Sequence, residues 1–221
     1  MNSDNEKEAV DKEDSLTDKK IANENIKSKK NKKKTKKKLN IEKEIIGWIK
    51  SIAFVIIFTF IFLRIFTNAR IPSSSMENTI MTEDRLFGYN FAYKNSDVKR
   101  GDIIIFRMPD EPHEIYIKRV IGIAGDDISY IEQKNDNSGS EIKVVRNGEI
   151  LDEPYIKEPM IEFEDKNLNF KVPENCVFVM GDNRNNSYDG RYWENHFVDK
   201  GAVIAKAVFR YWPLNKMGVV N

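Results

Sequence analysis

The chain has 221 residues, 40% of them hydrophobic, which suffices for one domain with a substantial core together with a tail and a subdomain. Its 36 basic and 35 acidic residues nearly cancel, so any effect of charge must come from their uneven distribution. The single cysteine, Cys176, excludes an internal disulfide. The two histidines, His113 and His196, are far apart and have no neighbouring cysteine, so we expect no metal and no cofactor.

The N-terminal region carries the strongest local charge. Nine of the twelve residues from 27 to 38 are lysine. Such a run repels itself and cannot bury apolar area, so residues 1–44 are predicted to form a disordered basic tail. A nucleic-acid-binding arm has the same lysine density. The segment that follows decides between the two interpretations.

Residues 45–66 predict one membrane-spanning helix. The stretch from Ser51 to Leu63 is uncharged, Lys50 and Arg64 flank it, and Trp48 lies where an interfacial aromatic residue is expected. A cleavable signal and a buried core helix are the alternatives. The long preceding tail disfavours the first, and the absence of a polar face disfavours the second. The lysines place the N-terminus in the cytoplasm and residues 67–221 outside, and attraction to anionic lipid explains the tail without nucleic acid.

After the span, short β-branched and aromatic runs alternate with Gly, Pro, Asn and Asp, which predicts a mostly β domain. Asn147 and Gly148 predict a two-residue hairpin turn of type I′. The polar segment 132–140 is predicted to be an exposed loop. Residues from about 129 to 175 are expected to form a smaller lobe inserted into the main sheet.

Three consecutive serines, Ser73 to Ser75, follow Pro72 and raise the question of a nucleophile. If Pro72 holds the segment extended, Ser73 and Ser75 point to the same side and Ser74 points away. One hydroxyl of such a pair could attack a carbonyl while the other stabilises the oxyanion.

A serine nucleophile requires a base, and the sequence offers histidine or lysine. His113 lies in a proline-bounded acidic turn and His196 in an ordinary polar segment, so both are expected to be structural. Lys118 lies within an apolar strand, where alternation places it on the same face as Tyr116 and Val120. Desolvation there would lower its pKa and make it a base. An exposed edge-strand lysine that guards against aggregation is the alternative.

Four motifs in order, "IPSSSMENT", "RGDIIIF", "YIKRVIGIAGD" and "GDNRNNSYDGR", resemble those of the type I signal peptidases of serine protease family S26. These are membrane-bound proteases that remove signal peptides from exported proteins. The resemblance covers about three quarters of the chain, and the single span is similar to the Gram-positive form. It implies a signal-peptidase/SOS-repressor-like β catalytic domain with a smaller inserted β lobe, preceded by one transmembrane helix.

The resemblance also implies roles for individual residues. The serine before the methionine, Ser75, corresponds to the nucleophile, Lys118 to the general base, and Ser73 to the side-chain donor to the oxyanion. Ser187 corresponds to the residue that orients the lysine amine. A supporting ion pair corresponds to Asp189 and Arg191, while Asp182 and Arg184 are expected to hold the loop.

Three positions depart from the family pattern. Asn78 and Ala124 stand where the family often has proline, and Gly190 stands where it has serine. None of the three is a proposed nucleophile, base or oxyanion donor, so we expect them to affect local loop shape and substrate preference.

The resulting hypothesis is a membrane-anchored endopeptidase that acts through a Ser–Lys dyad and an acyl-enzyme. The expected partners are signal-peptide-bearing preproteins, the lipid bilayer and the secretion translocon, with no nucleic acid. Shallow pockets for small substrate residues are expected beside Ile71, Ile80 and Ile117. The alternatives are a self-cleaving Ser–Lys protease like the SOS repressors and a catalytically silent, membrane-anchored scaffold.

Overall fold

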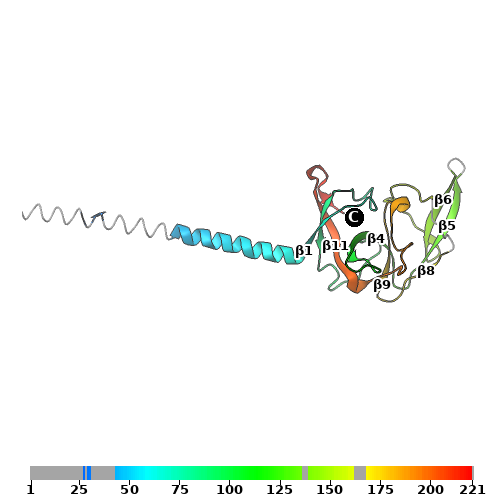
Figure 1. Ribbon diagram of the computed structural model, residues 1–221, viewed down its shortest axis with the longest axis horizontal. Coiled ribbons are helices and arrows are strands. Elements are labelled where there is room, and N and C mark those ends of the chain that lie inside the picture. The colour runs from blue at the N-terminus through cyan, green and yellow to red at the C-terminus, as the bar shows by residue number, and fades with distance from the viewer. Residues whose placement is uncertain (1–26, 28, 31–42, 136–138, 162–167, 221) are drawn as a thin grey trace, which may run out of the picture. The chain divides into compact units, whose positions relative to one another are not determined.

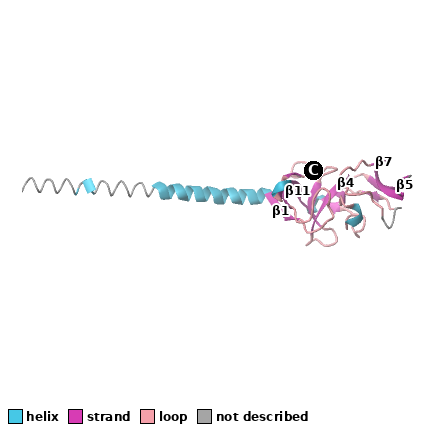
Figure 2. Cartoon of the chain, turned by 90° about the horizontal axis from the view of Figure 1, so that it is seen from above, coloured by secondary structure: helices cyan, strands magenta, loops and turns pink. Residues whose placement is uncertain are grey.

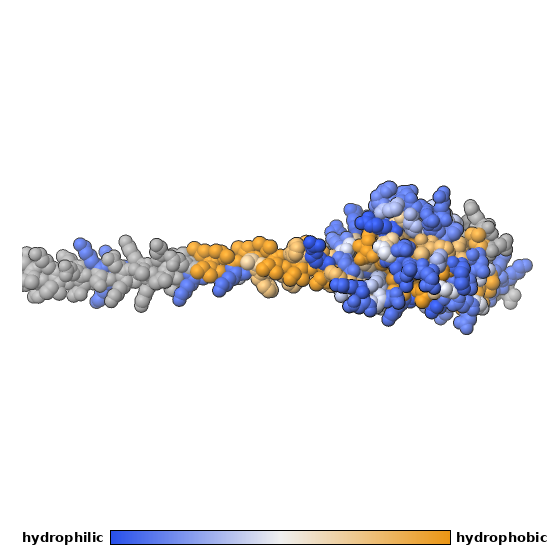
Figure 3. Space-filling model, turned by 90° about the horizontal axis from the view of Figure 1, so that it is seen from below, coloured by the Kyte–Doolittle hydropathy of each residue, from blue (hydrophilic) through white to orange (hydrophobic). Residues whose placement is uncertain are grey.

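One long helix precedes the β structure in the computed structural model, which describes residues 27, 29–30, 43–135, 139–161 and 168–220. The helix runs from Lys43 to Ile65 and is long and apolar enough to cross a membrane. Figure 3 shows its apolar side chains on the surface, and Trp48 is 72% exposed. Phe66, expected to end the helix, begins strand β1 instead. Most of the predicted basic tail lies outside the described residues.

The main sheet is antiparallel and has the strand order β1-β2-β11-β3-β4-β9-β10, with β12 paired to β11. Figures 1 and 2 label β1, β4 and β11 of this sheet. The strands of the sheet are β1 (Phe66–Arg70), β2 (Arg85–Tyr89), β3 (Ile103–Arg107), β4 (Ile115–Ile123), β9 (Cys176–Met180), β10 (Val198–Asp199), β11 (Val203–Trp212) and β12 (Gly218–Val219). Three short 3₁₀ helices, η1 (Arg184–Asn186), η2 (Lys200–Ala202) and η3 (Leu214–Lys216), lie in the connections. The predicted mostly β class is confirmed.

A second antiparallel sheet has the order β7-β6-β5-β8 and lies to the right of the main sheet in Figure 1. Its strands are β5 (Asp127–Asn135), β6 (Gly139–Arg146), β7 (Glu149–Ile150) and β8 (Phe170–Lys171). Arg146 pairs with Glu149 across Asn147 and Gly148, both of which have positive φ (54° and 84°). The hairpin turn predicted from these two residues is confirmed.

The loop predicted over residues 132–140 is wrong at both of its ends. Residues 132–135 continue β5 and residues 139–140 begin β6, with Glu132 paired to Ile142 and Lys134 to Ser140. Backbone pairing extends the hairpin past its apolar part, where side chains need no buried partner and can remain polar. Composition therefore overstated the length of the loop.

Strand β4 is the centre of the core. It pairs with β3 on one side and with β9 on the other. Six consecutive residues, 117–122, are buried, and they contribute to all three hydrophobic clusters of the domain. Ile117 packs with Ile71 and Ile80, Val120 with Phe106 and Trp193, and Ile121 with Phe178. A polar side chain on this strand is thus held in a dry, rigid setting.

Replacing Ile104, a fully buried β3 residue opposite Lys118, tests the importance of this core. Ile104→Ala should lower the free energy of unfolding by about 2 to 5 kcal/mol, because it leaves a cavity. Denaturant unfolding of the full chain in detergent would measure the change. Ile150→Ala removes the same atoms from a residue that is 52% exposed, and it should change the free energy by no more than about 0.5 kcal/mol. Equal effects of the two variants would contradict this description of the core.

Candidate active site

The three serines lie in a turn that follows β1, between two anchored ends. Ile71 donates its amide to the Asp84 carbonyl (3.0 Å), and Met76 directly after the serines is fully buried. The segment bends instead of remaining extended as expected. The expected pairing of side chains nevertheless holds, since the Ser73 and Ser75 hydroxyl oxygens are 3.3 Å apart. The Ser74 hydroxyl accepts a hydrogen bond from the Asn186 amide (2.9 Å).

Lys118 projects from β4 to Ser75. Its amine donates a hydrogen bond to the Ser75 hydroxyl oxygen at 2.7 Å, and the two residues are 4% and 6% exposed. The amine lies 5.3 Å from the centre of the Tyr116 ring, as expected for residues on one strand face. Burial lowers the pKa of Lys118 from 10.5 to about 8, with Asp189 opposing this shift and Arg191 adding to it. The edge-strand alternative is therefore wrong.

The segment from Gly181 to Arg191 packs behind this pair and is held by a buried ion pair. Arg191 donates two hydrogen bonds to the Asp189 carboxylate (2.8 and 2.9 Å), and the Gly181 amide donates a third (2.8 Å). Burial alone would raise the pKa of Asp189, but these contacts hold it below its ordinary value. Ser187 is buried beside Gly181. Among the described residues, it has no hydrogen bond to Lys118.

Two further buried ion pairs fix the same segment, and sequence reasoning missed their partners. Asp182 accepts two hydrogen bonds from Arg119 (both 2.8 Å), and Arg184 donates two to Glu153 (both 2.7 Å). The expectation that Asp182 and Arg184 hold the loop agrees with these contacts. Arg119 directly follows Lys118 in the sequence and could have been suspected, whereas no sequence pattern points to Glu153.

A cleft of about 390 Å³ opens over the serines and Lys118. Of the three isoleucines expected beside the substrate, Ile117 lines the cleft, while Ile71 and Ile80 are buried in the core next to it. Sequence reasoning did not anticipate the other lining residues, which are Pro72, Glu114, Ile115, Tyr116, Asn186 and Tyr188. The exposed Tyr188 ring stacks with the Tyr192 ring, their centres 6.5 Å apart.

Two departures from the family pattern have a structural reason. Asn78 has a φ of 80°, which proline cannot adopt because its ring fixes φ near −65°. At Gly190, a Cβ atom would lie 2.7 Å from the His196 carbonyl oxygen, so a serine does not fit this backbone. We find no structural explanation for Ala124.

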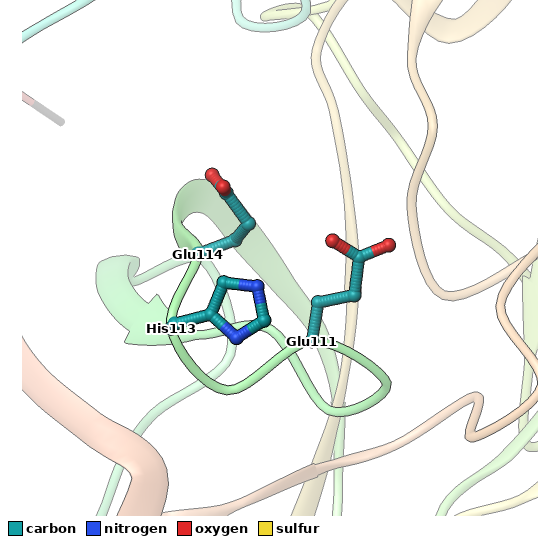
Figure 4. A group of neighbouring side chains, drawn as sticks. All are labelled: Glu111, His113 and Glu114. Atoms are coloured by element: carbon teal, nitrogen blue, oxygen red, sulfur yellow. The ribbon is translucent and has the colours of Figure 1, made fainter.

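Neither histidine is placed as a base for Ser75. The His196 ring lies 2.8 Å from the Gly190 carbonyl oxygen and packs against Phe170. His113 lies on an exposed turn, where its ring and the carboxylates of Glu111 and Glu114 come within 4.8 Å of one another (Figure 4). The three side chains are exposed, and only Glu114 of the three lines the cleft. The contacts of the two histidines thus require no catalytic role for either residue.

Gly181 provides a direct test of the packing behind the serine turn. A Cβ atom there would overlap the Ser75 carbonyl oxygen and the Ser187 hydroxyl. Gly181→Ala should therefore displace Ser75 and lower kcat/KM at least about tenfold, since displacements of about 1 Å can cost about a hundredfold. Gly218→Ala is the control, because no atom lies within 4 Å of its Cβ position. Full activity of a folded Gly181→Ala protein would contradict the observed packing.

Comparisons with known proteins agree with the motifs. Residues 45–212 match the family "Signal peptidase, peptidase S26". A probable signal peptidase I-2 from Synechocystis sp. is 38% identical over 68% of this chain, and the chain spans 65% of that relative's length. Signal peptidase I P from Bacillus subtilis subsp. natto is 36% identical over 84% of this chain and 96% of the relative. A crystal structure of a signal peptidase I from Enterococcus faecalis V583 aligns with 50% of this chain and 97% of its own, at 28% identity and a TM-score of 0.37. The chain belongs to the signal peptidase family, peptidase S26.

Proposed function

We propose that this protein is a membrane-anchored serine endopeptidase that cleaves signal peptides from exported preproteins, with Ser75 as nucleophile and Lys118 as general base. Family membership supports the cleavage of signal peptides by a serine protease. The observation that carries the residue assignment is the 2.7 Å hydrogen bond between two buried side chains, the Lys118 amine and the Ser75 hydroxyl. A catalytically silent scaffold would not require a buried amine against a hydroxyl.

The reaction proceeds in two stages. Neutral Lys118 removes the Ser75 proton as the serine oxygen attacks the scissile carbonyl carbon, which forms a tetrahedral intermediate. Collapse of this intermediate breaks the peptide bond, and the Lys118 ammonium returns the proton to the departing amine, which leaves an ester on Ser75. Water, deprotonated by Lys118, then attacks the ester, and the serine oxygen recovers a proton as the cleaved signal peptide leaves.

The negative charge of the intermediate requires hydrogen-bond donors. The Ser73 hydroxyl, 3.3 Å from the Ser75 hydroxyl, and the Ser75 amide N–H are the proposed donors. Among the described residues, that N–H makes no hydrogen bond of its own, so it is available to substrate. Loss of one such donor typically costs about 2.7 to 4 kcal/mol of transition-state stabilisation.

The surrounding residues are proposed to support the base. The buried Ser187 hydroxyl orients the Lys118 amine once substrate excludes water. The ion pair between Asp189 and Arg191 keeps the segment that carries Ser187 in place. Asp189 raises the pKa of Lys118 and Arg191 lowers it. The ion pair can therefore lie near the amine without favouring its protonated form.

The proposed topology places residues 1–44 in the cytoplasm, the helix across the bilayer and residues 67–221 outside, with an inserted lobe near residues 129–175. Ser75 is nine residues from Phe66, a chain length of at most about 30 Å. This brings the serine near the outer leaflet, where a preprotein whose apolar segment is in the bilayer would present its cleavage site.

Removal of either reactive group tests the assignment. Ser75→Ala and Lys118→Ala should each abolish measurable cleavage of an exported precursor by the full chain in detergent, because the first removes the proposed nucleophile and the second the proposed base. Gel analysis of the precursor and mature forms would measure this, with folding checked by thermal denaturation. Retained cleavage by either folded variant would exclude the dyad.

The pH dependence of cleavage identifies the base. Since only neutral Lys118 can accept the proton, kcat/KM should rise about tenfold per pH unit below pH 8 and level off above the lysine's pKa of about 8. Initial cleavage rates between pH 6 and pH 10 would give the midpoint. A midpoint near 6.5 would instead favour a histidine base.

A further inference from the structure

Asn183 binds the serine turn from behind through two hydrogen bonds. Its backbone N–H donates to the Ser75 carbonyl oxygen (3.0 Å), and its side-chain amide donates to the Ser74 carbonyl oxygen (3.1 Å). The residue is 1% exposed and does not line the cleft, whereas Ser74 and Ser75 do. Asn183 thus contacts the backbone on both sides of the nucleophile without reaching the place where substrate binds.

The Ser74 carbonyl oxygen accepts hydrogen bonds from the Asn183 side-chain amide (3.1 Å) and from the Glu77 backbone N–H (3.0 Å), and its direction sets that of the proposed oxyanion donor. The Ser74 carbonyl and the Ser75 N–H belong to one planar trans peptide, so the two groups point in opposite directions. Because the carbonyl is held by Asn183 together with Glu77, the N–H is directed away from Asn183 and toward the cleft side of the turn. A donor bound to the carbonyl also polarises the peptide and makes its N–H a stronger donor.

The backbone of Asn183 is rigidly held, while its side-chain oxygen is buried and has no hydrogen-bond partner among the described residues. Its backbone carbonyl oxygen accepts a hydrogen bond from the Asn186 backbone N–H (3.0 Å). Its neighbours Asp182 and Arg184 form the buried ion pairs with Arg119 and Glu153. The side-chain amide can adopt only one orientation here, because the reverse would place two oxygen atoms against each other. A hydrogen bond from so fixed a group can hold the Ser74–Ser75 peptide in one orientation before substrate arrives.

We propose that Asn183 is a positioning residue that sets the direction and strength of the Ser75 N–H as an oxyanion donor. This inference rests on the proposed function of Ser75. It predicts a loss confined to steps in which the oxyanion forms, because the Asn183 side chain does not line the cleft and, among the described residues, makes no hydrogen bond to Lys118.

Asn183→Ala tests the proposal in the full chain in detergent, because it removes the side-chain donor and keeps the backbone N–H. We expect kcat to fall about 10- to 100-fold, less than the largest losses seen when an oxyanion donor is removed. KM should stay within about threefold, and the pH midpoint should stay near that of the unchanged protein. Asn183→Asp, which replaces the donor by an acceptor of the same size, should show the same loss and serves if the alanine variant does not fold.

A matched control lies two residues away. The side-chain amide of Asn185 donates hydrogen bonds to the Glu158 carboxylate and to the Pro159 carbonyl oxygen, not to the serines. Asn185→Ala should therefore leave kcat within about twofold of the unchanged protein.

A peptide aldehyde distinguishes positioning from a general loss of structure, because its adduct with Ser75 carries the oxyanion geometry. Its affinity should fall by the same factor as kcat, while the affinity of a cleaved product peptide should not change. A folded Asn183→Ala protein with kcat within twofold of the unchanged protein, or with equal losses for aldehyde and product, would overturn the proposal. If instead Ser75→Ala retained activity, the proposed function itself would fail, and the two failures are thus distinguishable.

Discussion

The structure depends on keeping one amine out of water. Lys118 lies on the central strand of the domain, where its neighbours along β4 are buried on both faces, and its amine contacts a hydroxyl instead of a carboxylate. A buried ammonium without a carboxylate partner is costly, so burial lowers the pKa of Lys118 to about 8, which supports its proposed role as the base. The burial that makes a charged Lys118 costly for folding is thus the same property on which its proposed catalytic role depends.

The surroundings of Lys118 are organised to avoid undoing this effect. The nearby carboxylates of Asp182 and Asp189 favour the protonated amine by raising the pKa of Lys118, but each is bound by an arginine, Arg119 or Arg191. In the Asp189–Arg191 pair, Arg191 lowers the pKa of Lys118 while Asp189 raises it, so this pair has an electrostatic consequence in addition to holding the segment that follows β9. That segment in turn packs against the serine turn through Gly181 and Asn183. The core and the ion pairs thus support the serine turn and Lys118 together.

Much of the fold and of the site was predictable from local patterns. Alternation within β4 placed Lys118 on the face of Tyr116, and the Asn147–Gly148 pair gave the hairpin turn. Ser75 and Lys118 are 43 residues apart in the sequence, and no periodic pattern predicts that they lie close together. Only the family resemblance linked the two residues. The Arg184 partner Glu153 comes from the connection between β7 and β8, and Asn183 binds backbone carbonyl groups of the serine turn; composition encodes neither contact. The polar end of the β5–β6 hairpin was misjudged because exposed strand pairs carry loop-like side chains.

The most direct test of this account is the titration of the Lys118 amine itself. Lysine side chains labelled with ¹³C at Cε report protonation through their chemical shift, and the Lys118 signal is the one missing from a Lys118→Met protein. We predict a midpoint at about pH 8 for Lys118, while exposed lysines titrate near 10.4. A Lys118 midpoint near 10.4 in the folded full chain would contradict the claim that burial makes this lysine the base.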